Sequence, residues 1–231
     1  MSKSNQLQVS KTRTIPFPNE YILALSGEFR EWTFDEEAAP LLKGKWREQA
    51  FKVNPETPFD LEIGTGNGLH FAHHAVQNPN RCLLGIELKY KPLIQSIRRA
   101  RRAGMSNARM ARYNAYLVTQ LFDVGEINDV FIFFPDPWEK LRQQKHRLIQ
   151  DEFLKQLFQV QKPGSRLVFK TDSRDYFDWA LERFQRSPYK VAGHTYDLHT
   201  SEFAAQNFVT QFESIFMRQN KQIGYAVMER P

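Results

Sequence analysis

From residue 59 onward, short apolar segments alternate with segments of helical periodicity, and this alternation constrains the fold more than any other feature of the chain. Apolar segments such as "DVFIFF" have the length and composition of buried strands. Strands joined by helices pair in parallel and are covered on both faces, so we predict an α/β fold with a mostly parallel sheet. Ligands of such sheets bind beyond the carboxyl ends of the strands.

The expected elements follow this alternation to the end of the sequence. Strands are predicted at 59–64, 81–88, 108–114, 129–134, 165–172, 189–198 and 223–230. Helices are predicted at 69–77, 89–104, 115–122, 147–161 and 174–185, after two helical pieces at 28–32 and 39–51. We expect a flexible arm at 1–20, followed by one domain with a helical extension at 21–58 and a core at 59–231.

The composition narrows the setting of the protein. A single cysteine, Cys82, excludes an internal disulfide framework and fits a reducing compartment. No apolar run is long enough to span a bilayer, and the N-terminus lacks the apolar segment of a signal peptide. We therefore expect a cytoplasmic protein without a membrane partner. Whether it is a monomer or a homodimer is left open.

Basic residues exceed acidic ones by 32 to 26 and gather in two places, which favours a polyanionic partner. Four arginines lie between Arg98 and Arg102, where a solvated helix end is the alternative interpretation. A second basic run, 139–147, includes Lys140 and Arg142 and follows "FPDPW". Phosphate groups would be attracted to that run.

A glycine-rich loop follows the first predicted core strand. Gly64, Gly66 and Gly68 alternate in "LEIGTGNG", and Leu69 stands where a dinucleotide-binding loop would have its third glycine. With Glu62 two residues before the first glycine, the pattern is that of S-adenosylmethionine-dependent methyltransferases. An ordinary glycine turn is the alternative.

The next two strand ends also carry polar side chains. Glu87 ends the second core strand, where a carboxylate accepts hydrogen bonds from both ribose hydroxyls of an adenosine. Asn114 follows the third, where its carbonyl could accept from an adenine amino group, or it is a simple turn residue. In "FFPDPW", Pro135 and Pro137 restrict the backbone on both sides of Asp136. The glycine loop, Glu87 and Asn114 lie at the ends of consecutive predicted strands, and together they indicate a nucleoside cofactor.

Three histidines, His70, His73 and His74, raise the question of a metal. No cysteine pair or nearby glutamate completes a ligand set, so we expect no metal. We also find no nucleophile–base arrangement.

Between about 59 and 229 the sequence resembles the bacterial tRNA (guanine-N7)-methyltransferases. The matching segments are "LEIGTGNG", "GIEL", "FFPDPW" with its basic run, "FKTDSRDY" and "TQFE". "FPDPW" is the most discriminating, because common amino-methylating enzymes carry N/D-P-P-Y at that strand end. The resemblance implies a Rossmann-like class I fold, S-adenosyl-L-methionine as methyl donor, and guanosine 46 in the variable loop of tRNA as the target.

The resemblance also implies the roles of individual residues. Cofactor-binding positions are Glu62, Gly64, Gly66, Gly68, Glu87, Asn114 and Asp136, of which Asp136 is also the catalytic position. Substrate-binding positions are Lys140, Asp172, Thr210, Gln211, Phe212 and Glu213. The family usually has an aspartate where Asn114 stands, and its basic run is usually richer in cations. The first 58 residues match poorly and receive no role beyond contact with tRNA.

Three other functions remain open at this point. They are methylation of another RNA base or a small molecule, RNA binding without catalysis, and NAD-dependent oxidoreduction, which Leu69 disfavours.

Overall fold

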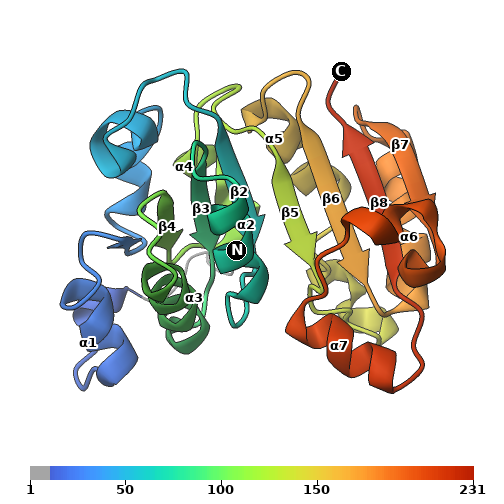
Figure 1. Cartoon of the computed structure of the whole chain (residues 1–231), viewed down its shortest axis with the longest axis horizontal. Coiled ribbons are helices and arrows are strands. Elements are labelled where there is room, and N and C mark those ends of the chain that lie inside the picture. The colour runs from blue at the N-terminus through green and yellow to red at the C-terminus, as the bar shows by residue number, and fades with distance from the viewer. Residues whose placement is uncertain (1–10) are drawn as a thin grey trace.

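Eight strands pair into one sheet in the computed structural model, which describes residues 11–231 (Figure 1). The strands are β1 Thr33–Phe34, β2 Phe59–Ile63, β3 Cys82–Ile86, β4 Ala108–Ala111, β5 Val130–Phe133, β6 Arg166–Thr171, β7 Lys190–Thr195 and β8 Gly224–Glu229. The α-helices are α1 Glu20–Ser26, α2 Leu69–Gln77, α3 Tyr90–Arg102, α4 Val118–Leu121, α5 Asp151–Val160, α6 Arg174–Arg186 and α7 Gln211–Arg218.

The sheet is mostly parallel, as predicted. Its order is β1-β4-β3-β2-β5-β6-β8-β7, and every neighbouring pair from β1 to β6 is parallel. Within the described chain, only the two pairs that β8 makes, with β6 and with β7, are antiparallel. The carboxyl ends of the parallel strands therefore lie at one edge, the lower edge in Figure 1, where the arrowheads of β5 and β6 point.

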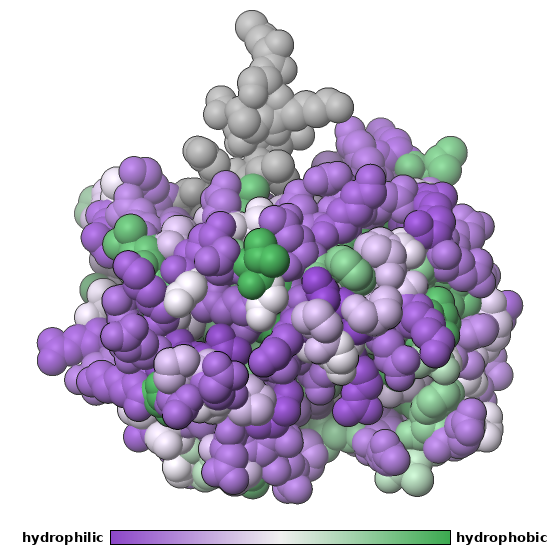
Figure 2. Space-filling model, turned by 90° about the horizontal axis from the view of Figure 1, so that it is seen from above, coloured by the Kyte–Doolittle hydropathy of each residue, from purple (hydrophilic) through white to green (hydrophobic). Residues whose placement is uncertain are grey.

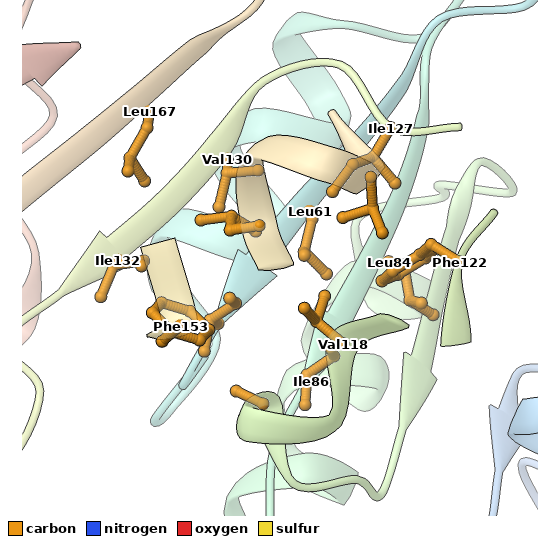
Figure 3. Packing of buried hydrophobic residues seen from close by; sticks show 14 of the residues in the cluster. Leu61, Leu84, Ile86, Val118, Phe122, Ile127, Val130, Ile132, Phe153 and Leu167 are labelled. Atoms are coloured by element: carbon orange, nitrogen blue, oxygen red, sulfur yellow. The ribbon is translucent and has the colours of Figure 1, made fainter. Parts of the chain in front are cut away.

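Helices cover both faces of the sheet, and two hydrophobic layers result. Leu83 of β3 points into the layer under α1, α2 and α3, whereas its neighbour Leu84 points into the layer under α4, α5 and α6. In the second layer Phe153 of α5 and Val118 of α4 pack over the central strands (Figure 3). Because the central strands are buried on both sides, they need the continuous apolar runs that the sequence shows.

Several elements differ from expectation. Residues 28–32 form turns, and 39–51 contains a 3₁₀ helix at Ala39–Leu42 and a π-helix at Trp46–Phe51. Helix α5 begins at Asp151, after the loop that contains Arg147, and not at 147. Strand β1 and helix α7 were not expected. Of the predicted arm, residues 1–10 lie outside the described part, and α1 begins at Glu20.

The opposite edge of the sheet shows few features of a site. Seen from above, the surface at the amino ends of the parallel strands is mostly hydrophilic, with apolar residues scattered singly, which is usual for a protein surface (Figure 2). Among the described helices, none has both the length and the apolar character needed to cross a membrane.

Gly68, which precedes α2, gives a stability prediction. Its φ is +75°, and a Cβ there would lie 2.4 Å from the backbone Cα of Ser96. We expect Gly68→Ala to lower the free energy of unfolding by about 2–5 kcal/mol, because left-handed strain adds to overpacking. Gly104→Ala is the matched control: its φ is +79°, but a Cβ would meet no atom within 4 Å. Urea unfolding that shows equal losses would contradict the packing argument.

Candidate active site at the carboxyl ends of the strands

The glycine loop joins the end of β2 to the start of α2. Gly64, Gly66 and Gly68 all have positive φ, which is the backbone conformation that favours glycine. Glu62, inside β2, is 3% exposed, and its Oε2 lies 2.7 Å from Nδ1 of His70 on the first turn of α2. The loop backbone and this carboxylate therefore have fixed positions at the carboxyl edge.

Two of the three histidines of α2, His70 and His74, bind buried carboxylates, and His73 stacks on the ring of Phe208. His74 Nε2 lies 2.8 Å from Asp60 Oδ2, and Arg81 bonds the same carboxylate. Although burial alone would raise the pKa of Asp60, the bonds from His74 and Arg81 hold it below its ordinary value. Across residues 11–231 no three His, Cys, Asp or Glu side chains are grouped to hold a metal. The contacts of His70 and His74 are thus accounted for within the protein.

The next two strand ends present Glu87 and Asn114. The Glu87 carboxylate accepts from the backbone N–H groups of Leu88 (2.8 Å) and Lys89 (3.0 Å). Burial raises the pKa of Glu87, and these two hydrogen bonds oppose the rise. Asn114 Oδ1 accepts from the N–H of Tyr116 at 3.1 Å and caps a short helix.

Asp136 follows β5 and is exposed, within a turn whose backbone is constrained on both sides. Phe134 and Trp138 have φ of 52° and 43°, which costs a residue with a side chain about 1–2 kcal/mol. Pro135 and Pro137 fix two further φ angles. Neighbouring structure must therefore hold this turn.

Arg147 holds that turn. Its side chain is fully buried, and Nε donates to the carbonyl oxygen of Pro137 at 2.7 Å. The guanidinium also pairs with Asp175 and lies 5.0 Å and 5.1 Å from the ring centres of Tyr176 and Trp179. Within the basic run, Arg147 therefore has a structural role, because it supports the Asp136 turn from the interior of the protein.

The rest of the basic run faces solvent. Lys140, Arg142 and Lys145 are exposed beside the Asp136 turn. The four arginines of α3 differ, because three of them contact other parts of the chain. Arg98 pairs with Glu28, Arg99 donates to the backbone oxygen of Asn67 in the glycine loop, and Arg101 stacks on Trp32.

Helix α7 brings the expected segment 210–213 to the glycine loop. Gln211 hydrogen-bonds to Asn67, and the ring of Phe212 would lie 3.6 Å from a Cβ on Gly66. Beyond the other end of the helix, Lys221 binds Asp172, which follows β6, at 2.7 Å. The strand ends and α7 thus enclose one region, at the lower edge in Figure 1.

Within 210–213 the four side chains fall into two pairs. Gln211 and Phe212 are exposed, whereas Thr210 and Glu213 are buried and form a capping box at the start of α7. The Thr-x-x-Glu spacing in the sequence was the signal for this unexpected helix. Only Gln211 and Phe212 are placed to meet a ligand in this arrangement.

Glu213 also anchors α7 to the sheet. It is fully buried and lies 3.1 Å from Nζ of Lys170 in β6, and it accepts from Asn207 Nδ2 at 2.5 Å. Burial lowers the pKa of Lys170, and the Glu213 carboxylate opposes this shift. A buried ion pair therefore fixes the helix that lies over the glycine loop.

Comparisons with known proteins agree with this arrangement. A family model described as "Putative methyltransferase" matches residues 56–226. A tRNA (guanine-N(7)-)-methyltransferase of Bdellovibrio bacteriovorus is 50% identical over 208 residues, which are 90% of this chain and 100% of that protein. One from Lachnoclostridium phytofermentans is 36% identical over 75% of this chain and 80% of its own. These matches span the glycine loop and the Asp136 turn.

Solved structures support the fold. The crystal structure of the 16S rRNA methyltransferase KamB superposes with a TM-score of 0.54 and covers 75% of this chain and 88% of its own. At 16% identity the likeness concerns the fold, and it confirms the predicted Rossmann-like α/β architecture.

The Lys170–Glu213 pair gives a pH-dependent prediction. We expect Glu213→Ala to lower the free energy of unfolding at pH 7 by about 3–5 kcal/mol, because a buried ammonium loses its partner. A lysine whose pKa is lowered in the folded state destabilises that state at pH values below the lowered pKa. This destabilisation decreases as the pH rises from the lowered pKa toward 10.5. The loss should therefore shrink at pH 9.5.

Urea unfolding at the two pH values measures this loss. Glu202→Ala, which removes an exposed glutamate at the start of the short helix Glu202–Gln206, is the control and should change little. An equal loss at both pH values for Glu213→Ala would exclude Lys170 as the cause.

Proposed function

This chain belongs to the tRNA (guanine-N(7)-)-methyltransferase family, and from that premise we propose that it transfers a methyl group from S-adenosyl-L-methionine to N7 of guanine 46 in tRNA. The observation that carries the proposal is the exposed Asp136, held on a constrained turn at the same sheet edge as the glycine loop. Because the proposed substrate is tRNA, we also propose a cytoplasmic location for the enzyme.

The residues at this edge fit the methyl donor. The donor supplies an electrophilic methyl group on a sulfonium. Glu62 and the glycine-loop backbone suit its amino-acid part, and Glu87 suits the two ribose hydroxyls. We assign Asn114 to the adenine. A Cβ at Gly64 would meet no atom within 4 Å, so the loop backbone is open to a close ligand.

The reaction requires little acid–base catalysis from the protein. Guanine N7 has an exposed lone pair and is unprotonated at neutral pH, so no general base is required. The protein must hold N7 in line with the methyl carbon and the sulfur, which is catalysis by positioning. The purine becomes cationic during transfer, and the Asp136 carboxylate, on its constrained turn, stabilises that charge or accepts from guanine N1–H and the N2 amine.

The substrate contacts that we propose lie around Asp136. Lys140 and Arg142 bind phosphates, and Asp172 lies at the next strand end. In segment 210–213, Gln211 and Phe212 reach the nucleotide, while Thr210 and Glu213 contribute by holding α7 in place.

A direct experiment tests the activity. Purified protein is incubated with methyl-labelled S-adenosylmethionine and bulk tRNA, and 7-methylguanosine is mapped by chemical cleavage of the strand at modified sites. Cleavage at position 46 supports the proposal. Label at another base, or label only in a small molecule, would replace it with one of the other methyltransferase functions.

The role of Asp136 predicts a separation of binding from catalysis. We expect Asp136→Ala to bind S-adenosylhomocysteine within a few-fold of the wild type and to lose methyl transfer by about 100-fold or more, because a preorganised charge is removed. Calorimetry measures binding, and transfer of labelled methyl measures turnover. Glu139→Ala, which removes an exposed carboxylate three residues further on, is the control. Unchanged turnover in Asp136→Ala would exclude the residue from the reaction.

The exposed cations predict a salt effect. Replacing Lys140 or Arg142 by alanine should reduce the slope of log Kd for tRNA against log salt concentration by about one unit each, because one phosphate contact is lost. Lys155→Ala, on the exposed side of α5, should leave the slope unchanged. Filter binding at several salt concentrations measures the slopes. A slope that does not change in either variant would rule out direct phosphate contact.

A further inference from the structure

The segment Lys11–Ile15, which we call the N-terminal strap, packs onto the turn that follows β1. It contains one helical turn at Thr12–Thr14, and Thr12 is 7% exposed. The Thr12 hydroxyl donates to Glu36 Oε2 at 2.7 Å, and its backbone N–H donates to the other oxygen of the same carboxylate. The hydroxyl and the backbone N–H of Thr12 therefore both bind the buried carboxylate of Glu36.

Glu36 also binds Arg112, which directly follows β4. Arg112 Nη1 donates to Glu36 Oε2 at 2.8 Å, and these two side chains are 6% and 7% exposed. The Arg112 guanidinium lies 4.3 Å from the ring centre of Tyr90, whose hydroxyl lies 3.0 Å from the Thr12 hydroxyl. Thr12 thus completes a compact buried cluster with Glu36, Arg112 and Tyr90.

This cluster continues to the proposed ribose-binding acid. Arg112 Nε donates to the backbone oxygen of Leu88 at 3.1 Å, and the N–H of Leu88 donates to the Glu87 carboxylate at 2.8 Å. Tyr90 is the first residue of α3, so the cluster also fixes the other end of the short turn after Glu87. An unbroken series of contacts leads from the strap to Glu87.

The charges of the strap favour this internal role over contact with RNA. Lys11 pairs with Glu37 at 2.9 Å, and Arg13 pairs with Asp35 at 2.8 Å. A cation that is already paired with a carboxylate gains less from a phosphate group, because the carboxylate repels that phosphate. The basic residues of the strap are therefore poor candidates for a tRNA-binding surface.

We propose that Thr12 is a positioning residue of the cofactor site, which acts through Glu36 and Arg112 to hold the Leu88 turn and so to aim Glu87 at the ribose. The inference rests on the proposed function, because Glu87 has this role only if an adenosine cofactor binds. The strap then forms part of the cofactor site although it lies far from the glycine loop in the sequence.

Thr12→Val tests the proposal, since it keeps the shape of the side chain and removes the hydroxyl. We expect the Kd for S-adenosylhomocysteine to rise about tenfold, in line with the loss of a hydrogen bond to a charged group. At saturating cofactor the kcat should stay within twofold, and the Kd for tRNA should not change. Thr12→Ser should restore cofactor binding.

Thr14→Val is the matched control, because its hydroxyl is exposed and bonds to Lys11 within the strap. It should bind cofactor like the wild type. Tyr90→Phe removes the neighbouring hydroxyl and keeps the ring under Arg112, so we expect a rise in Kd of about threefold even if Thr12→Val folds poorly.

The possible results separate the two proposals. An unchanged Kd for S-adenosylhomocysteine in folded Thr12→Val and Tyr90→Phe would overturn the positioning role. Weaker binding of tRNA with intact cofactor binding would also overturn it and would assign the strap to the RNA surface. A wild-type protein that fails to bind S-adenosylhomocysteine would instead remove the proposed function, and the role of Glu87 with it.

Discussion

The parallel pairing of β2 with both β3 and β5 is the constraint on which the site depends. The register places Glu62 opposite Gly85 on one side and Phe131 on the other, so the three strands end at nearly the same level. A shift of one residue in any of them would turn its side chains to the opposite face. The backbone hydrogen bonds of the sheet thus determine where the glycine loop, Glu87 and the Asp136 turn meet.

The strand ends could be predicted from the sequence because each polar residue directly follows an apolar run, and the edge at which parallel strands end is then fixed by the topology. Helix α7 was not predicted, although Phe212, Ile215 and Phe216 have the i, i+3, i+4 spacing of an amphipathic helix. Its start is set by Thr210 and Glu213, which form a local signal. The burial of Glu213, in contrast, depends on a lysine from a distant strand that no local pattern reveals.

The same limit applies to the charged residues that hold the site together. Arg147 lies in a basic run and cannot be distinguished from its exposed neighbours by sequence, because the side chains that it contacts, such as Asp175 and Trp179, lie on α6. Glu36–Arg112 and Lys170–Glu213 likewise join segments that are far apart in the chain. Such pairs contribute little net stability, since desolvation offsets their attraction, but losing one partner is costly. They fix the arrangement of the strap, the Asp136 turn and α7 around the proposed cofactor site.

The position of β8 has a consequence for synthesis of the protein on the ribosome. Strand β7 pairs with β8, and β8 lies between β7 and β6, although it is the last strand of the chain. A chain made from its N-terminus can pair β1 to β6 as they emerge, but β7 must wait without a strand partner until residues 224–229 leave the exit tunnel. Residues 224–229 are therefore the ones that close the sheet, and a folding intermediate in which they have not yet docked exposes the unpaired edges of both β6 and β7.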